Sequence, residues 1–214
     1  MVGCGKCSTG WAYGIKKTLR AAEQDLPRIR EQRERWPSMI GEIDAARFIF
    51  VDESGITTEM TRRYGRVAGG QRVNDSTPAH WRTLTLLGAV GFAGWVASMT
   101  IEAPTDTDVF LAFLDQVLCP KLKPGHVVVM DNLAAHKVAG VSERILATGA
   151  QLLYLPPYSP EFNPIEKCWA QAKQYLCAAK ARTLPALEQA VTAALAELTP
   201  DQAAAYFRHC GYQA

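Results

Sequence analysis

Three acidic residues stand at element ends where a folded chain could bring their carboxylates together. Asp52 follows a short apolar run at 48–51, and Asp131 follows another at 126–130. Glu166 lies at the start of a segment whose apolar residues have helical spacing. Carboxylate oxygens are the ligands that hard divalent cations such as Mg²⁺ or Mn²⁺ prefer, and Asp and Glu are ionised at neutral pH. The three residues are therefore candidates for metal-assisted chemistry.

Each acidic residue also has a structural alternative. Glu53 adjoins Asp52, but side chains alternate along a strand, so only one of the two can face the cluster. Glu166 stands three residues after Asn163 and could complete a capping box at a helix start instead. Glu161 is a rival for the third position, although it lies in a proline-flanked loop. The joint placement of three acids at element ends favours metal chemistry over three separate structural roles.

The elements that must position these acids follow a mixed α/β pattern. Three opening strands are followed by alternating helices and strands, which predicts a mixed sheet with helices on its faces. Short right-handed crossovers make the first and fourth strands parallel neighbours, which brings Asp52 and Asp131 together. We expect the first strand to close in a turn at 52–55. Strands are expected at 48–51, on either side of the GFAG turn, at 126–130 and at 151–155, and helices at 105–118, 137–148, from Asn163 past Leu176, and at 184–198.

The composition describes a globular chain of 214 residues, 48% of them apolar. It excludes intrinsic disorder, collagen-like repeats and coiled-coil rods. Six scattered cysteines predict a reducing cytoplasm, and the Cys4 and Cys7 pair lacks the further ligands of a zinc site. The 19 uncharged residues between Arg82 and Glu102 are long enough to span a membrane. Their glycines and the GFAG turn predict a buried β-hairpin instead, so we expect no membrane partner.

Three sequence blocks carry a resemblance to a known family. The blocks are FVDESG around Asp52, VVVMDNLAAHK around Asp131 and LLYLPPYSPEFNPIEKCWAQAK around Glu166. They closely resemble the catalytic blocks of DDE transposases of the insertion-sequence 630 family, the bacterial mariner-like group. Between Asp131 and Glu166 lie 34 residues, the spacing typical of that family, and the resemblance extends from about Gly14 to Tyr212.

The resemblance implies a ribonuclease-H-like fold with a mixed five-stranded sheet and a catalytic, metal-binding triad of Asp52, Asp131 and Glu166. It places Asn132 and His136 in the family's DNxxxH pattern as neighbours of the active site. For His136, a polar residue at a helix start is an equal alternative. The implied cofactor is Mg²⁺ or Mn²⁺, expected as two ions. Water would then cleave DNA at the transposon end, and the freed 3′-hydroxyl would attack target DNA.

Basic residues around the predicted hairpin are candidates for DNA contact, because phosphate binding needs positive charge that does not neutralise the triad. The whole chain has a formal net charge of only +2, but its basic residues are locally concentrated at 59–82. A strand edge protected by charge is the alternative explanation for these arginines. Lys173 lies one heptad beyond Glu166 on the same expected helix. The candidates are Arg62, Arg63, Arg66, Arg72 and Lys173.

The expected domain organisation is a tail and charged linker over 1–43 and a catalytic domain over 44–214. The charged segment 16–35 predicts a solvated helix. Family members normally carry an N-terminal helix-turn-helix region, and nothing similar precedes Lys16. We therefore expect an active domain with a helix-turn-helix partner from an upstream frame or, alternatively, an inactive or co-opted remnant that binds DNA or a partner. The resemblance also implies a homodimer, which joins two DNA ends, and a bacterial, nucleoid-associated cytoplasmic location.

Overall fold

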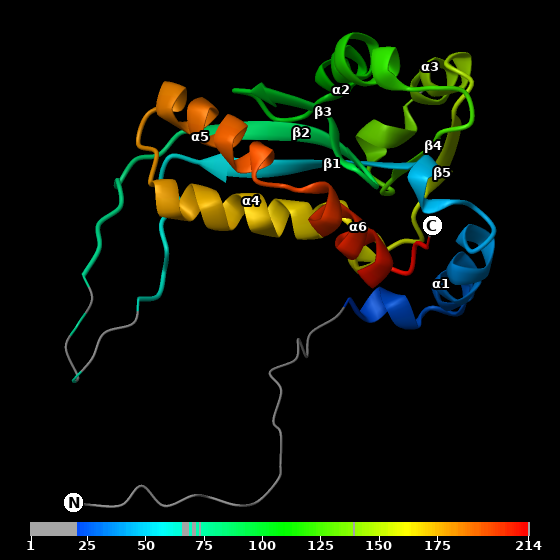
Figure 1. The fold of residues 1–214 in the computed structure, drawn as a ribbon, viewed down its shortest axis with the longest axis horizontal. Coiled ribbons are helices and arrows are strands. Elements are labelled where there is room, and N and C mark those ends of the chain that lie inside the picture. The colour runs from blue at the N-terminus through cyan, green and yellow to red at the C-terminus, as the bar shows by residue number, and fades with distance from the viewer. Residues whose placement is uncertain (1–20, 66–68, 70–71, 73, 139, 214) are drawn as a thin grey trace, which may run out of the picture.

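A mixed five-stranded sheet forms the centre of the protein in the computed structural model, which describes residues 21–65, 69, 72, 74–138 and 140–213 (Figure 1). The strand order is β3-β2-β1-β4-β5. The first three strands pair antiparallel, and β4 runs parallel to both β1 and β5. The parallel pairing of β1 with β4 was predicted from the sequence. The strands are β1 (Phe48–Thr57), β2 (Thr83–Gly91), β3 (Gly94–Ile101), β4 (Val127–Met130) and β5 (Gln151–Tyr154).

Strand β1 is longer than the sequence predicted, and the expected turn at 52–55 was wrong. Parallel pairing with β4 covers only residues 48–50, but antiparallel pairing with β2 extends from Ile49 to Thr57. The backbone hydrogen bonds of β2 therefore keep β1 extended after β4 has ended. Asp52 consequently lies inside a strand, opposite Gly88 of β2, and is held more firmly than a turn residue would be.

Helices cover both faces of the sheet. Residues Phe48 and Phe50 face the layer of α4, α5 and α6, whereas Ile49 and Val51 face the layer of α2 and α3. Figure 1 shows α2 and α3 on the side of the sheet opposite α4 and α6. The helices are α1 (Pro27–Ile40), α2 (Thr107–Phe113), α3 (Val141–Ala147), α4 (Ile165–Ala179), α5 (Leu184–Ala196) and α6 (Pro200–His209).

Several helices differ from their expected limits. The helix expected at 105–118 becomes π-helical after Phe113, and the one expected at 137–148 is split into a 3-10 turn at 134–137 and α3. Helix α6 was not predicted. It begins at a capping box formed by Thr199 and Gln202, and Phe207 packs edge-on against Phe50 at 5.3 Å between ring centroids.

Helix α1 is not a purely solvated helix. Its side chains Ile29, Trp36 and Ile40 are buried, and the last two belong to the core on the α4 side of the sheet. The indole nitrogen of Trp36 donates a hydrogen bond to the hydroxyl of Tyr212 over 3.1 Å. The start and the end of the described chain are thereby packed together.

Strands β2 and β3 form the hairpin that the sequence predicted around the GFAG turn. Among the described residues, no helix has the length and apolar character needed to cross a membrane. Cys4 and Cys7 lie outside the described residues, as does Lys16.

Candidate active site

The strand order brings two of the three predicted acids to one place, and α4 adds the third. Asp52 is buried within β1, 9% exposed, and Asp131 directly follows the last residue of β4. Glu166 lies in the first turn of α4 and is exposed. Burial, followed by repulsion from Glu166, Glu53 and Asp131, raises the pKa of Asp52 to about 7. The carboxylates therefore lie close enough to act on one another electrostatically.

This concentration of negative charge fits a divalent cation, because a cation relieves the repulsion that raises the pKa of Asp52. The donor set is all oxygen, which suits Mg²⁺ or Mn²⁺. Within the described part of the chain, no three His, Cys, Asp or Glu side chains surround a common point closely enough to hold an ion.

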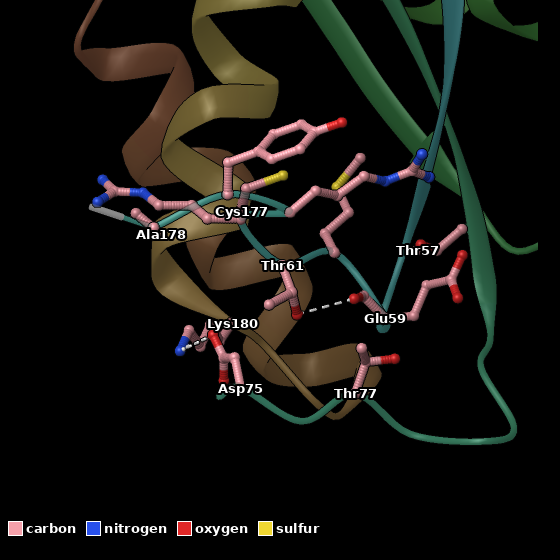
Figure 2. A pocket seen from close by; sticks show the side chains of 13 residues that line it. Thr57, Glu59, Thr61, Asp75, Thr77, Cys177, Ala178 and Lys180 are labelled. Carbon is pink, nitrogen blue, oxygen red and sulfur yellow. Dashed lines mark hydrogen bonds and ion pairs between the residues drawn. The ribbon is translucent and has the colours of Figure 1, made fainter. Parts of the chain in front are cut away.

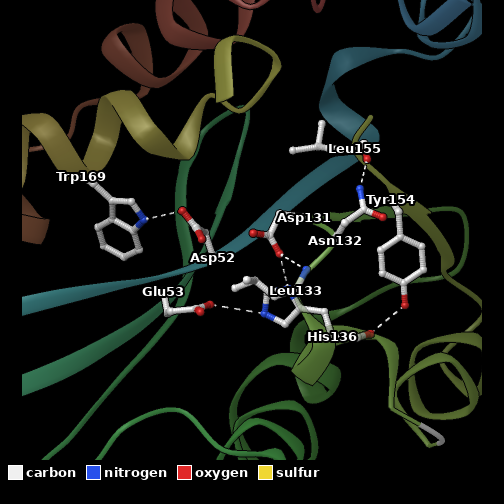
Figure 3. A network of polar contacts seen from close by, with 9 residues as sticks. All are labelled: Asp52, Glu53, Asp131, Asn132, Leu133, His136, Tyr154, Leu155 and Trp169. Carbon is white, nitrogen blue, oxygen red and sulfur yellow. Dashed lines mark hydrogen bonds and ion pairs between the residues drawn. The ribbon is translucent and has the colours of Figure 1, made fainter. Parts of the chain in front are cut away.

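His136 joins Asp131 to Glu53 through its two ring nitrogens (Figure 3). Its Nδ1 lies 2.7 Å from Asp131 Oδ1 and its Nε2 lies 3.3 Å from Glu53 Oε2. The ring is fully buried and packs on Phe110 at 4.5 Å between centroids. Burial alone would lower the pKa of His136, but the hydrogen bond with Asp131 and the nearby carboxylate of Glu53 raise it to about 9. An imidazolium between two carboxylates results.

The position of Glu53 follows from strand alternation, as expected. Asp52 points to the α4 face of β1, and Glu53 points to the opposite face, where it meets His136. Burial alone would raise the pKa of Asp131, but hydrogen bonds from His136 and from the Leu133 backbone lower it. Asp131 is therefore kept ionised beside the buried Asp52.

Asn132 fixes the end of β4 to the segment that follows β5. Its amide nitrogen donates a hydrogen bond to the carbonyl oxygen of Leu155. The hydroxyl of Tyr154 donates to the carbonyl oxygen of His136 over 2.7 Å. The two neighbours predicted for the site, Asn132 and His136, both lie beside Asp131 (Figure 3).

Sequence reasoning missed the contact between Trp169 and Asp52. Trp169 Nε1 donates to Asp52 Oδ2 over 3.1 Å, and the indole ring lies 4.8 Å from that of Trp95. Gly88 permits this packing, since a Cβ atom there would lie only 2.5 Å from Trp169 Cη2. The available signal was the spacing of Trp169, three residues after Glu166, which places both on one side of α4.

The capping-box alternative for Glu166 is not observed. The N-cap residue of α4 is Pro164, and no side chain makes a capping hydrogen bond there. Asn163, expected to cap the helix, is buried and its Oδ1 has no hydrogen-bond partner among the described residues. The helix start is set instead by proline, whose fixed φ suits the first turn. Glu166 therefore makes no capping hydrogen bond in this structure, although an acid in the first turn still suits the helix dipole.

Glu161, the rival for the third acid, lies in a different set of contacts. It forms an ion pair with Arg33 of α1 and does not contribute to the pKa of Asp52. Arg33 also donates to the Tyr158 carbonyl over 3.0 Å and to Ser159 Oγ over 2.7 Å. Arg33 thereby fastens the loop that leads to α4, in which Tyr158 has a φ of 57°.

Some of the predicted DNA-contacting residues come together in one groove. Arg62 and Arg63 line one side of a groove of about 520 Å³, and Lys173 lines the other side, which is formed by α4. Tyr64 in the same groove is 92% exposed. Arg72 is exposed but does not line this groove, and Arg66 lies outside the described residues. The structure therefore groups three of the five basic candidates.

A larger cavity of about 960 Å³ adjoins this groove where the segment after β1 meets the end of α4 (Figure 2). Lys180 closes one side through an ion pair with Asp75 at 2.6 Å. Arg182 fastens both ends of the segment between β1 and β2. Its guanidinium donates to the carbonyls of Thr58, Met60 and Ser76 and to Thr61 Oγ1.

Comparison with solved structures identifies the fold. Mos1 transposase in a paired-end complex with the left transposon end matches with a TM-score of 0.77 and 14% identity, over 96% of this chain and 64% of that chain. A pre-cleavage Mos1 transpososome gives 0.76 and 14%, over 95% and 64%. The catalytic domain of Mos1 mariner transposase gives 0.58 and 13%, over 90% and 89%. The expected ribonuclease-H-like fold is confirmed.

The chain spans less than two thirds of the Mos1 chains in these complexes. No curated protein matches the sequence. Residues 47–188 match the family described as DDE superfamily endonuclease, which is well over half of the chain and includes Asp52, Asp131 and Glu166. The protein is therefore a member of the DDE superfamily of endonucleases.

Proposed function

We propose that this chain is the catalytic domain of a DDE transposase of the insertion-sequence 630 family. It would hydrolyse DNA at a transposon end and join the resulting 3′-hydroxyl to target DNA. The observation that supports this most strongly is the meeting of Asp52 and Asp131 at the end of β4, with Glu166 close enough to raise the pKa of Asp52. Membership of the DDE endonuclease family agrees with this chemistry.

Asp52, Asp131 and Glu166 would hold the divalent metal, Mg²⁺ or Mn²⁺, expected as two ions. When bound, the metal supplies the positive charge that allows an anionic nucleophile to approach a phosphodiester and stabilises the leaving oxygen. Mos1 paired-end complexes have been solved with each of these metals. The chain's own residues prepare the acids: Trp169 orients the carboxylate of Asp52, and His136 orients that of Asp131.

DNA would lie along α4, where Arg62, Arg63 and Lys173 line one groove. Arg66 and Arg72 belong to the same segment of the sequence and are proposed to contact phosphates as well. Glu166 lies in the first turn of α4 and Lys173 lies about two turns further along. The groove therefore lies beside the later part of the helix, away from the acids. The similar Mos1 structures include a complex with a transposon end and a strand transfer complex, which supports DNA as the ligand.

The wider assembly is proposed on the same basis. The proposed domain limits are 44–214 for the catalytic domain and 1–43 for a linker whose helix α1 packs against that domain. The active form is a homodimer in the bacterial cytoplasm, associated with the nucleoid. A helix-turn-helix partner would supply recognition of the transposon ends. The alternative function is an inactive or co-opted remnant that binds DNA or a partner without cleaving DNA.

Nicking of supercoiled plasmid by the purified chain in Mg²⁺ tests this proposal. We expect Asp131→Asn and Glu166→Gln each to reduce nicking by about 100-fold or more, because each removes a charged oxygen ligand. Glu188→Gln is the matched control, since it neutralises an exposed acid on α5, away from the three acids and from Arg33. Equal nicking by the wild type and Asp131→Asn would reject the assignment, and metal-independent DNA binding without nicking would support the remnant.

A further inference from the structure

A second basic cleft lies between α1 and the ends of β4 and β5. Its volume is about 460 Å³, and it is distinct from the groove along α4. Asn132, which directly follows Asp131, forms part of its wall. Figure 3 shows Asn132 and Leu155 on the side of Asp131 away from Trp169. The cleft therefore lies beside Asp131, on the side away from Trp169.

The charge of the cleft is one-sided. Arg28 and Arg35 of α1 and Lys137 of the turn after β4 line it, and no acidic side chain does. Arg35 is ion-paired with Glu31 one helical turn away at 2.6 Å, but both side chains are largely exposed, so this pair is weak and can be exchanged for another anion. Three cations around a small cleft favour an anionic ligand such as a phosphodiester.

The remaining wall is flat and largely apolar. Pro156 and Pro157 line it with Tyr154, whose hydroxyl is tied to the His136 carbonyl. Lys137 Nζ lies 5.6 Å from the centroid of the Tyr154 ring. A fixed aromatic ring beside cations is the combination that stacks a nucleobase while holding its phosphate. The cleft has the size of a small-ligand pocket, which suits an unpaired nucleotide and not a double helix.

We propose that this cleft binds unpaired DNA beside the acid cluster. Phosphates contact Arg28, Arg35 and Lys137, and a base packs against Tyr154. The inference rests on the proposed function in that it takes DNA as the ligand, and it adds a site for a single strand on the side of Asp131 away from Trp169. The cleft lies beside Asn132 and Asp131, so an unpaired strand held in it would pass next to the acids.

Fluorescence anisotropy with a labelled oligothymidine and a duplex of equal length, in EDTA, tests this site without any cleavage. The variant Arg28→Gln/Arg35→Gln is expected to bind oligothymidine about tenfold more weakly. It should also flatten the log-affinity against log-salt plot by about 1.4, because about 0.7 is lost for each phosphate contact to a single strand. Affinity for the duplex should change less than twofold.

The matched control is Arg30→Gln/Arg208→Gln, which removes the same charge from exposed positions outside the cleft. It should bind oligothymidine within twofold of the wild type. The proposal is overturned if the cleft variant binds oligothymidine like the wild type, or if both variants weaken single-stranded and duplex binding equally. Displacement of oligothymidine by polyglutamate as readily as by unlabelled oligothymidine would also overturn it, in favour of an acidic peptide.

Photo-crosslinking with 5-iododeoxyuridine in the oligonucleotide locates the base directly. We expect the crosslinked tryptic peptide to contain Tyr154, and crosslinks confined to Tyr64 would contradict the proposal. Both experiments are free of metal. If the proposed nuclease function is wrong, the nicking assay with Asp131→Asn will show it and the two metal-free experiments will not. If the cleft does not bind single-stranded DNA, the binding and crosslinking experiments will show it and the nicking assay will not.

Discussion

Trp169 Nε1 donates a hydrogen bond to Asp52 Oδ2, so the helix that carries Glu166 also holds the carboxylate of β1. The two α4 residues are three positions apart and lie on one side of the helix. Any shift of α4 along the sheet therefore moves Glu166 and the hydrogen-bond donor of Asp52 together. The geometry between the first and third acids depends on how Trp169 packs against Trp95 and Gly88.

Trp169→Phe is expected to keep the ring packing and remove the donor to Asp52. A hydrogen bond to a charged group contributes about 1.5–3 kcal/mol, so the buried carboxylate becomes harder to ionise and the metal needed for half-maximal nicking rises. Nicking measured across Mg²⁺ concentrations checks this, with about a tenfold loss expected at limiting metal. Trp95→Phe is the control, because Trp95 stacks on Trp169 without bonding to Asp52. Identical metal dependence of the two variants would contradict the role given to Trp169.

Gly88→Ala should destabilise the fold. The added Cβ would lie 2.5 Å from Trp169 Cη2 and 2.9 Å from Trp95 Cζ3. Overpacking of this kind costs about 1–3 kcal/mol of unfolding free energy. Gly55→Ala is the matched control within the sheet, since a Cβ there meets nothing within 4 Å. Urea denaturation of both variants measures the difference, and equal midpoints would show that the tryptophan pair tolerates the methyl group.

Arg33→Gln should loosen the loop before α4. The substitution removes the ion pair with Glu161 and weakens the hydrogen bonds to Tyr158 and Ser159. We expect amide hydrogen exchange in the loop to accelerate about tenfold, because local opening no longer breaks these contacts. Nicking should fall, because the loop no longer fixes the position of Glu166 relative to the other two acids. Arg30→Gln on the same helix is the control, and unchanged exchange in Arg33→Gln would exclude a fastening role.

The metal-free protein is expected to lose stability as the pH rises from about 4 to about 9. Burial, and then repulsion from Glu166, raise the pKa of Asp52 from 3.8 to about 7, so the folded state holds this proton more tightly than the unfolded state. Its contribution is full below pH 3.8 and is lost as the pH rises to about 7. Urea unfolding in EDTA measures how the unfolding free energy falls over this pH range, and Asp52→Asn should make that fall smaller.

The loss of stability at higher pH comes from His136. Burial opposes its charge, but Asp131 and Glu53 raise its pKa from 6.5 to about 9. The stabilisation is full below pH 6.5 and is lost as the pH rises through 9. Glu53→Gln should shift this loss of unfolding free energy to lower pH, because it removes one of the two carboxylates beside His136. A wild-type unfolding free energy that increases between pH 5 and 9 would contradict both assignments.

The sequence was sufficient to predict the meeting of Asp52 and Asp131, because strand order and parallel pairing place them together whatever the side chains around them. Glu166 at the start of α4 was likewise readable from Asn163-Pro164 and the apolar stripe. The contact between Trp169 and Asp52 could not be predicted in the same way. The spacing of Trp169 indicates a core residue, and only the close approach that Gly88 allows brings its indole nitrogen to Asp52. Arg33 was also beyond prediction, since its contacts lie 125 to 128 residues away.

The guanidinium of Arg182 joins the two ends of the segment between β1 and β2 at its base. Arg182 therefore holds residues 58–61 and Ser76 together directly. Because Arg182 follows α4, it would also tie the proposed DNA-contacting segment to the helix that bears Glu166, so that a displacement of bound phosphates is passed on to the acid at the other end of that helix.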